Sequence, residues 1–131
     1  MKTNKLISIG KSTAVAISIL GIIHDIATFT PLIKGGLLCL TPDNLRAMIY
    51  MSLVCGTSII LSGILIFILI KKVEQYEFLT IPILIISSFL AISGLFSVIY
   101  MFDNPFAWIA FVLNMTMFSI ATLLRQKING K

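Results

Sequence analysis

Residues 47–70 read AMIYMSLVCGTSIILSGILIFILI, and none of these 24 consecutive side chains carries a charge. An α-helix rises 1.5 Å per residue, so about 20 apolar residues are enough to cross the hydrocarbon core of a bilayer. Apolar runs of similar length occupy residues 12–33, 79–102 and 105–124. The pattern therefore predicts four membrane-spanning helices.

The composition of the whole chain also indicates a membrane protein. Of its 131 residues, 58% are hydrophobic and 11% are charged, and the mean hydropathy is +1.06. Soluble domains carry roughly a quarter charged residues, so this chain cannot cover a surface in water and its expected surroundings are the lipid bilayer. The continuous apolar runs lack the alternation of a membrane β-barrel. Nucleic acid is not an expected partner, because no stretch combines basic residues with stacking aromatic ones.

The segments between the runs are short and rich in turn-forming residues. Lys34-Gly35-Gly36 ends the first run, and residues 41–44 (TPDN) form a turn with an N-cap for the second helix. A polar loop covers residues 71–77, and Pro105 follows a tight turn and suits the first turn of the last helix. Short loops make neighbouring helices antiparallel. We therefore expect one domain over residues 1–131, an all-α integral membrane four-helix bundle that runs up-down-up-down.

The basic residues are distributed unequally between the two ends of such a bundle. With four spans, the N-terminal flank, the 71–77 loop and the C-terminal tail share one side, and together they hold eight lysines and arginines. The other side holds only Lys34 and Arg46. Because basic loops stay on the cytoplasmic side, we expect a multi-pass protein of the inner (plasma) membrane with both termini in the cytoplasm.

Two ionisable residues, His24 and Asp25, are adjacent within the first apolar run. An ionisable side chain inside a membrane span is costly and marks a candidate functional site. Neighbouring residues point about 100° apart on a helix, so the two side chains cannot share one partner. They could hydrogen-bond to other helices and fix the packing, or form a site for a ligand, a substrate or a proton. No metal site is expected, because the chain has a single histidine.

Further polar residues lie at a similar depth in the other three runs. Ser58, Ser93 and Asn114 fall within about two helical turns of the plane that contains His24 and Asp25. The sequence thus predicts a polar cluster in the core of the bundle, and these five residues are the candidate ligand or proton site. The catalytic sequence motifs of common enzyme families are absent, and no cofactor is indicated.

Small residues recur along the predicted helices. Gly56 and Gly63 are seven residues apart in the second run, a spacing that lets two membrane helices approach closely. Cys55, beside Gly56, is expected to act as a small packing residue.

The segment Gly21-Ile22-Ile23-His24, with Thr28, Thr30-Pro31 and the glycine-bearing second run, resembles a loose group of uncharacterised small bacterial four-span membrane proteins. Those proteins carry a GxxH motif in the first helix and a Thr-Pro after it. The resemblance covers roughly the first half of the chain, and Asp25 stands where that group commonly has a non-acidic residue. It implies a four-span fold and a membrane location, and it brings no activity with it.

Three functions are consistent with these features. The first is an accessory protein that acts through interactions, with a further copy of the chain or another membrane protein as partner. The second is a small oligomeric transporter or channel that uses His24 and Asp25 as a proton relay. The third is a membrane enzyme or a lipid- or quinone-binding protein with His24 and Asp25 at its pocket.

Overall fold

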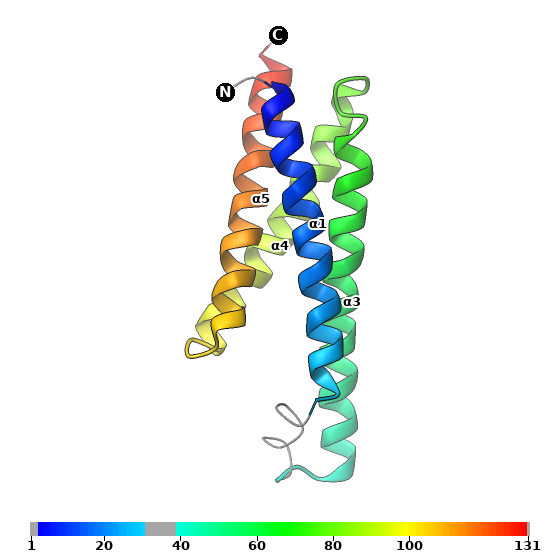
Figure 1. Ribbon diagram of the computed structural model, residues 1–131, viewed down its shortest axis with the longest axis vertical. Helices are drawn as coiled ribbons and strands as arrows, with labels where there is room; N and C mark the ends of the chain where they lie inside the picture. The colour runs from blue at the N-terminus through cyan, green and yellow to red at the C-terminus, as the bar shows by residue number, and fades with distance from the viewer. Residues whose placement is uncertain (1–2, 31–38, 131) are drawn as a thin grey trace.

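The computed structural model describes residues 3–30 and 39–130, and its four long helices form a bundle (Figure 1). They are α1 (Thr3–Thr28), α3 (Pro42–Ile70), α4 (Thr80–Tyr100) and α5 (Pro105–Asn129), and a short 3₁₀ turn, η1 (Glu77–Leu79), leads into α4. Each of the four is long and apolar enough to cross a membrane. The predicted all-α four-helix fold is confirmed.

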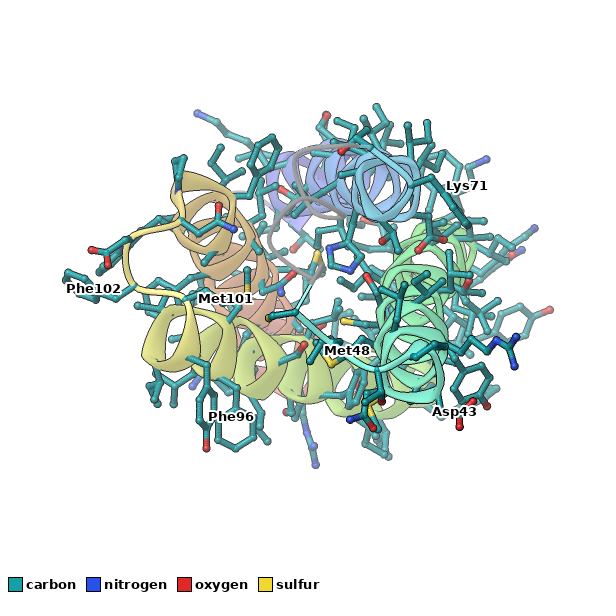
Figure 2. All side chains as sticks on the ribbon, turned by 90° about the horizontal axis from the view of Figure 1, so that it is seen from below. Asp43, Met48, Lys71, Phe96, Met101 and Phe102 are labelled. Carbon is teal, nitrogen blue, oxygen red and sulfur yellow. The ribbon has the colours of Figure 1, made fainter. Side chains whose placement is uncertain are left out.

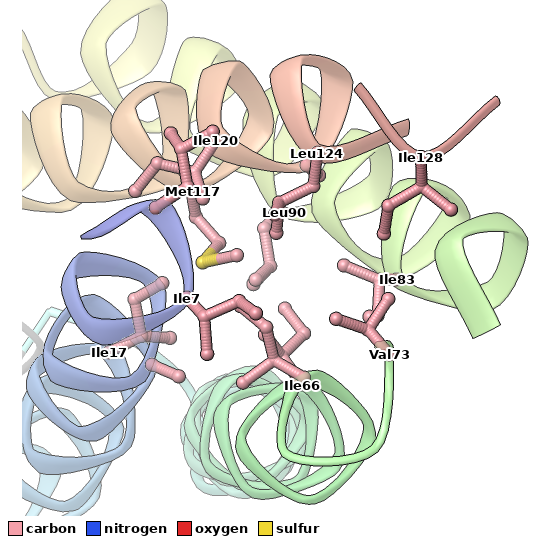
Figure 3. Close-up of a cluster of buried hydrophobic side chains, with 14 of the residues drawn as sticks. Ile7, Ile17, Ile66, Val73, Ile83, Leu90, Met117, Ile120, Leu124 and Ile128 are labelled. Carbon is pink, nitrogen blue, oxygen red and sulfur yellow. The ribbon is translucent and has the colours of Figure 1, made fainter. Parts of the chain in front are cut away.

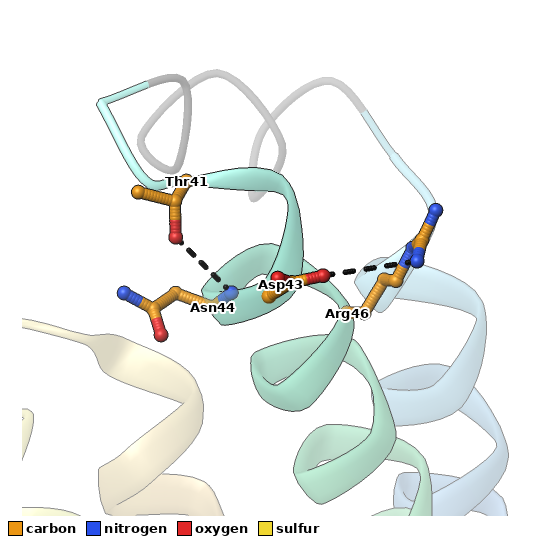
Figure 4. A network of polar contacts seen from close by, with 4 residues as sticks. All are labelled: Thr41, Asp43, Asn44 and Arg46. Carbon is orange, nitrogen blue, oxygen red and sulfur yellow. Dashed lines mark hydrogen bonds and ion pairs between the residues drawn. The ribbon is translucent and has the colours of Figure 1, made fainter.

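Local sequence signals set the starts of two helices. At the start of α3, the hydroxyl of Thr41 accepts a hydrogen bond from the backbone N–H of Asn44 at 3.4 Å, as the TPDN turn predicted (Figure 4). At the start of α5, the side chain of Asn104 accepts from the N–H of Phe106 at 2.9 Å. A proline follows each cap, at a position where its missing N–H costs nothing.

The helix bounds differ from the predicted spans at α1, α3 and α5. α1 begins at Thr3 rather than residue 12, α3 begins at Pro42 rather than residue 47, and α5 continues to Asn129 rather than residue 124. An apolar run shows which residues can lie in the hydrocarbon core of a bilayer. A helix can be longer than such a run, because it continues through polar flanking residues that contain no proline past the first helical turn. α1 ends at Thr28, whereas the predicted run reached residue 33; residues 31–33 lie outside the described part of the chain. Residues before a proline disfavour helix, which accounts for an end ahead of residue 31.

The helices stand in the order α1, α3, α4, α5 around the bundle (Figure 2). α1 packs along α3, and α4 along α5, so the chain forms two antiparallel helix pairs. α1 also contacts α5, and the contact between α3 and α4 is the smallest of the four between neighbouring helices. Both ends of the chain and the turn at residues 71–76 lie at one end of the bundle, which we call the termini end (Figure 1). The turn at residues 101–104 lies at the opposite end.

Buried positions recur every seven residues in each helix, the repeat that keeps one face toward a neighbour in a left-handed bundle. One of these repeats lies at the contacts within the two helix pairs, between α1 and α3 and between α4 and α5. Most of its residues are small, so the two backbones of a pair can approach closely. Its buried members are Ile7, Ala14, Gly21 and Thr28 in α1; Gly56, Gly63 and Ile70 in α3; Thr80, Ser87 and Gly94 in α4; and Ala107, Asn114, Ala121 and Ile128 in α5.

A second repeat faces the middle of the bundle and builds the apolar core (Figure 3). This core lies in the half nearer the termini, and its central members are Ile17, Ile59, Ile66, Ile83, Leu90, Met117 and Leu124.

Toward the opposite end the two helix pairs diverge (Figure 1), and the same faces become accessible. On α3, Ile59 is buried, whereas Ser52, seven residues earlier, is half-buried. On α1, Ile17 is fully buried, whereas His24 is half-buried. The bundle is therefore closed at the termini end and open at the other.

Candidate functional site

The contact between α1 and α3 depends on three glycines. A Cβ atom built on Gly21 would lie 2.8 Å from the carbonyl oxygen of Gly56, and one on Gly63 would lie 2.7 Å from that of Ala14. A Cβ atom on Gly56 would overlap the carboxyl group of Asp25 and approach the ring of His24 to 3.0 Å. These glycines bring the candidate residues of α1 directly onto the backbone of α3.

His24 belongs to a closed chain of hydrogen bonds that links α1 to α3. Its Nε2 atom lies 3.2 Å from the hydroxyl of Ser52, and that hydroxyl lies 2.6 Å from the hydroxyl of Thr28. Thr28 in turn lies one helical turn beyond His24 and donates to its backbone carbonyl at 3.0 Å. Thr28 is only 1% exposed, so its hydroxyl depends on these partners.

The hydroxyls of Ser52 and Thr28 can each donate or accept in these contacts, and the role of the Nε2 atom depends on the tautomer of the histidine. The Nε2 atom is held by Ser52 within the contact between α1 and α3. The geometry agrees with the structural interpretation of His24.

Asp25 points to a different part of α3, as the 100° offset requires. One carboxyl oxygen, Oδ2, accepts from the hydroxyl of Thr57 at 3.4 Å. The other, Oδ1, is buried against Gly56 and has no hydrogen-bond partner among the described residues. The ion pair formed within residues 3–30 and 39–130 is at the surface, between Asp43 and Arg46 at 3.8 Å (Figure 4), so no basic side chain neutralises Asp25 there.

Ser58 and Ser93 come together in a groove between α3 and α4. The groove has a volume of about 280 Å³ and lies in the half of the bundle where the helix pairs diverge. It opens on the outer surface, because Tyr50 is 69% exposed and Phe89 is 53% exposed. Its lining consists of Tyr50, Met51, Val54, Cys55, Ser58, Ile59, Phe89 and Ser93. Cys55 thus lines a groove and does not fill the interior, contrary to the expected packing role.

Asn114 lies apart from both places. It is 2% exposed and faces α4, where a Cβ atom on Gly94 would lie 3.2 Å from its Nδ2 atom. Its Oδ1 atom has no hydrogen-bond partner within the described residues. The five predicted site residues therefore occupy three places: the α1–α3 contact, the α3–α4 groove and the α4–α5 contact.

Several residues that matter at these places were not among the five predicted site residues. Ser52 and Thr57 hold the His24-Asp25 pair, and Tyr50 and Phe89 form the walls of the groove. One feature of the sequence could have indicated Ser52 and Thr57. They lie on either side of Gly56, the glycine against which Asp25 packs. In the described part of the chain, no group of three or more His, Cys, Asp or Glu residues is placed to hold a metal ion.

Comparison with known proteins adds no relationship: no family model matches the chain, and neither a curated protein nor a solved structure matches it.

Proposed function

We propose that the protein binds a small apolar molecule of the bilayer in the groove between α3 and α4, and that it works as an accessory membrane protein through this binding. The observation that supports the proposal is the groove itself, which lies within the span of two membrane-length helices and opens sideways between them. Its walls are mostly apolar with a few polar groups, the usual character of a small-molecule site.

The size of the groove favours a small molecule over a helix of a partner protein. Between Tyr50 and Ile59 the groove follows α3 for about 13 Å, and a helix of that length with a diameter of about 10 Å occupies roughly 1,000 Å³. The groove has about 280 Å³. A single hydrocarbon chain or one flat ring is thin enough to enter it.

The other two functions have less support from the geometry. His24 and Asp25 are turned toward α3 and do not line the groove, so they are poorly placed as an acid–base pair for a molecule bound there. A proton relay needs a chain of titratable or hydrated groups through the bundle. In the described residues, the buried polar side chains are hydroxyls and one amide, and the core at the termini end is apolar.

The proposal also includes the location in the cell. Of the described basic residues, Lys5, Lys11, Lys71, Lys72, Arg125 and Lys127 lie in segments at the termini end, and Arg46 lies at the opposite end. This distribution supports an inner-membrane protein with both termini in the cytoplasm.

The test uses the whole protein in lipid nanodiscs that contain phosphatidylcholine with a photoreactive diazirine in one acyl chain. We expect cross-links to concentrate on residues 50–59 and 89–93. Val54→Trp, which places a large ring in the groove, should suppress them. Ile64→Trp is the matched control, since Ile64 is an exposed residue of α3 outside the groove. Cross-links spread evenly around α3 and unchanged by Val54→Trp would contradict the proposal.

A further inference from the structure

One serine of the groove differs from Ser58, Ser88 and Ser97 in its hydrogen bonding. Ser58, Ser88 and Ser97 each donate to a carbonyl of their own helix, at 2.7, 2.8 and 2.7 Å, which is the usual arrangement for serine in a membrane helix. Ser93 is half-buried and lines the groove, yet its hydroxyl makes no hydrogen bond to any described residue. Ser93 therefore offers the groove a free hydrogen-bond donor.

The groove offers no charge to a bound molecule. None of its eight lining residues is an Asp, Glu, Lys, Arg or His. Asp25 is held on the α1 side of α3 by Thr57 and Gly56. A charged headgroup would therefore lose its hydration in the groove and gain no counter-charge. An uncharged acceptor, such as a carbonyl oxygen, matches the donor at Ser93.

The depth of Ser93 decides which carbonyl compounds can reach it. Ser93 lies seven residues before the end of α4 at Tyr100, which places it about 10 Å inside the helix end. The ester carbonyls of phospholipids are held near the polar headgroups at the edge of the hydrocarbon core. A carbonyl that lies about 10 Å deep belongs to a molecule free to enter the hydrocarbon.

The walls of the groove narrow the class of molecule further. Tyr50 on α3 and Phe89 on α4 are the two aromatic residues of the groove's lining. Aromatic side chains interact well with a flat ring in stacked or edge-on arrangements. An isoprenoid quinone combines the three required properties: a flat ring, uncharged carbonyl oxygens and an apolar tail.

We propose that the groove binds the head of an isoprenoid quinone, with one quinone carbonyl accepting a hydrogen bond from the Ser93 hydroxyl and the tail lying along the outer surface of α3. This inference rests on the proposed function, and it adds the class of molecule and the residue that recognises it. It concerns binding alone and involves no electron transfer.

The experiment measures the binding of decylubiquinone to the detergent-purified full chain, from the rise in the midpoint of thermal unfolding with ligand concentration. Decylbenzene, which has a ring and the same alkyl chain without carbonyls, is the matched ligand. We expect decylubiquinone to bind more tightly than decylbenzene, and Ser93→Ala to weaken it about threefold to tenfold, the effect of one hydrogen bond. Ser93→Thr, which keeps a hydroxyl, and Ser88→Ala, which changes a serine of α4 outside the groove, should bind like the wild type.

Two outcomes would overturn the inference. One is equal binding of decylubiquinone and decylbenzene to the wild type, a comparison that needs no variant to fold. The other is binding of decylubiquinone that Ser93→Ala leaves unchanged. If decylubiquinone fails to bind while photoreactive phosphatidylcholine still cross-links in the groove, the quinone inference fails and the proposed function stands. If neither occupies the groove, both fail.

Discussion

Gly21→Ala should destabilise the protein by forcing α1 away from α3. The added Cβ atom would lie 2.8 Å from the carbonyl oxygen of Gly56 and 2.9 Å from the backbone nitrogen of Ile60, whereas ordinary contact begins at 3.4 Å. Both neighbours are backbone atoms, so no change of rotamer relieves the overlap, and the two helices must separate by about 0.6 Å. The hydrogen bonds of His24 and Asp25 to α3 lie close to this point and should lengthen with it.

The size of the effect is set by two opposing contributions. Overpacking a close contact costs about 1–3 kcal/mol, and replacing glycine by alanine inside a helix returns up to about 1 kcal/mol through helix propensity. We therefore expect the free energy of unfolding to fall by about 1–2 kcal/mol. The assay is unfolding in mixed micelles with a rising fraction of dodecyl sulfate, followed by the fluorescence of Trp108, the chain's single tryptophan.

The matched control is Gly94→Ala on α4. Its added Cβ atom would meet Phe111 at 3.1 Å, an overlap of about 0.3 Å, so the gain in helix propensity should offset most of the cost. A second check combines Gly21→Ala with Gly63→Ala. Because one separation of α1 from α3 relieves both overlaps, the double variant should lose less than the sum of the single losses. If Gly21→Ala is as stable as the wild type, the close helix contact described above is wrong.

Three further predictions follow from the described contacts. His24→Ala and Ser52→Ala remove the same hydrogen bond, so a double-mutant cycle on unfolding should give a coupling energy of about 0.6 kcal/mol, and zero coupling would refute the bond. Asn114→Leu removes a buried amide whose oxygen has no partner and should leave the free energy of unfolding equal or higher; a clear loss would reveal a hydrogen bond to Asn114. In intact cells a membrane-impermeant maleimide should label Cys39 in the wild type. The variant Gln75→Cys, in a chain lacking the native cysteines, should react with the maleimide only after lysis. The reverse labelling pattern would invert the proposed orientation.

Signals within a few residues of one another allowed parts of the fold to be predicted well. The cap at Thr41 and the proline-led start of α5 depend on neighbouring residues only, and both are present in the structure. Continuous apolar runs identified the four helices. The start of α1 at Thr3 was missed, because hydropathy reports what can enter the bilayer and a polar flank can be helical as well.

The candidate site was predicted less well, because depth in the membrane does not fix the direction in which a side chain points. Counting residues placed Ser58, Ser93 and Asn114 near one plane, but only the two serines face the same groove. Asn114 belongs to the seven-residue repeat that turns toward α4, and it is buried there. The direction of each side chain depends on which helices are neighbours, and that arrangement is a property of the whole bundle.

The seven-residue repeats connect the open end of the bundle to its sequence. On the face that looks toward the middle, Ile17 of α1 is followed seven residues later by His24, Ile59 of α3 is preceded by Ser52, and Leu90 of α4 is followed by Ser97. Large apolar residues hold the helices together at the termini end, and in α1, α3 and α4 a polar residue replaces them where the helix pairs diverge. Polar side chains that bond within one helix or one helix pair contribute little attraction between the pairs. The change from apolar to polar residues along the repeat therefore accounts for the divergence that creates the α3–α4 groove. In a bundle with apolar residues along its whole length, the groove would be closed.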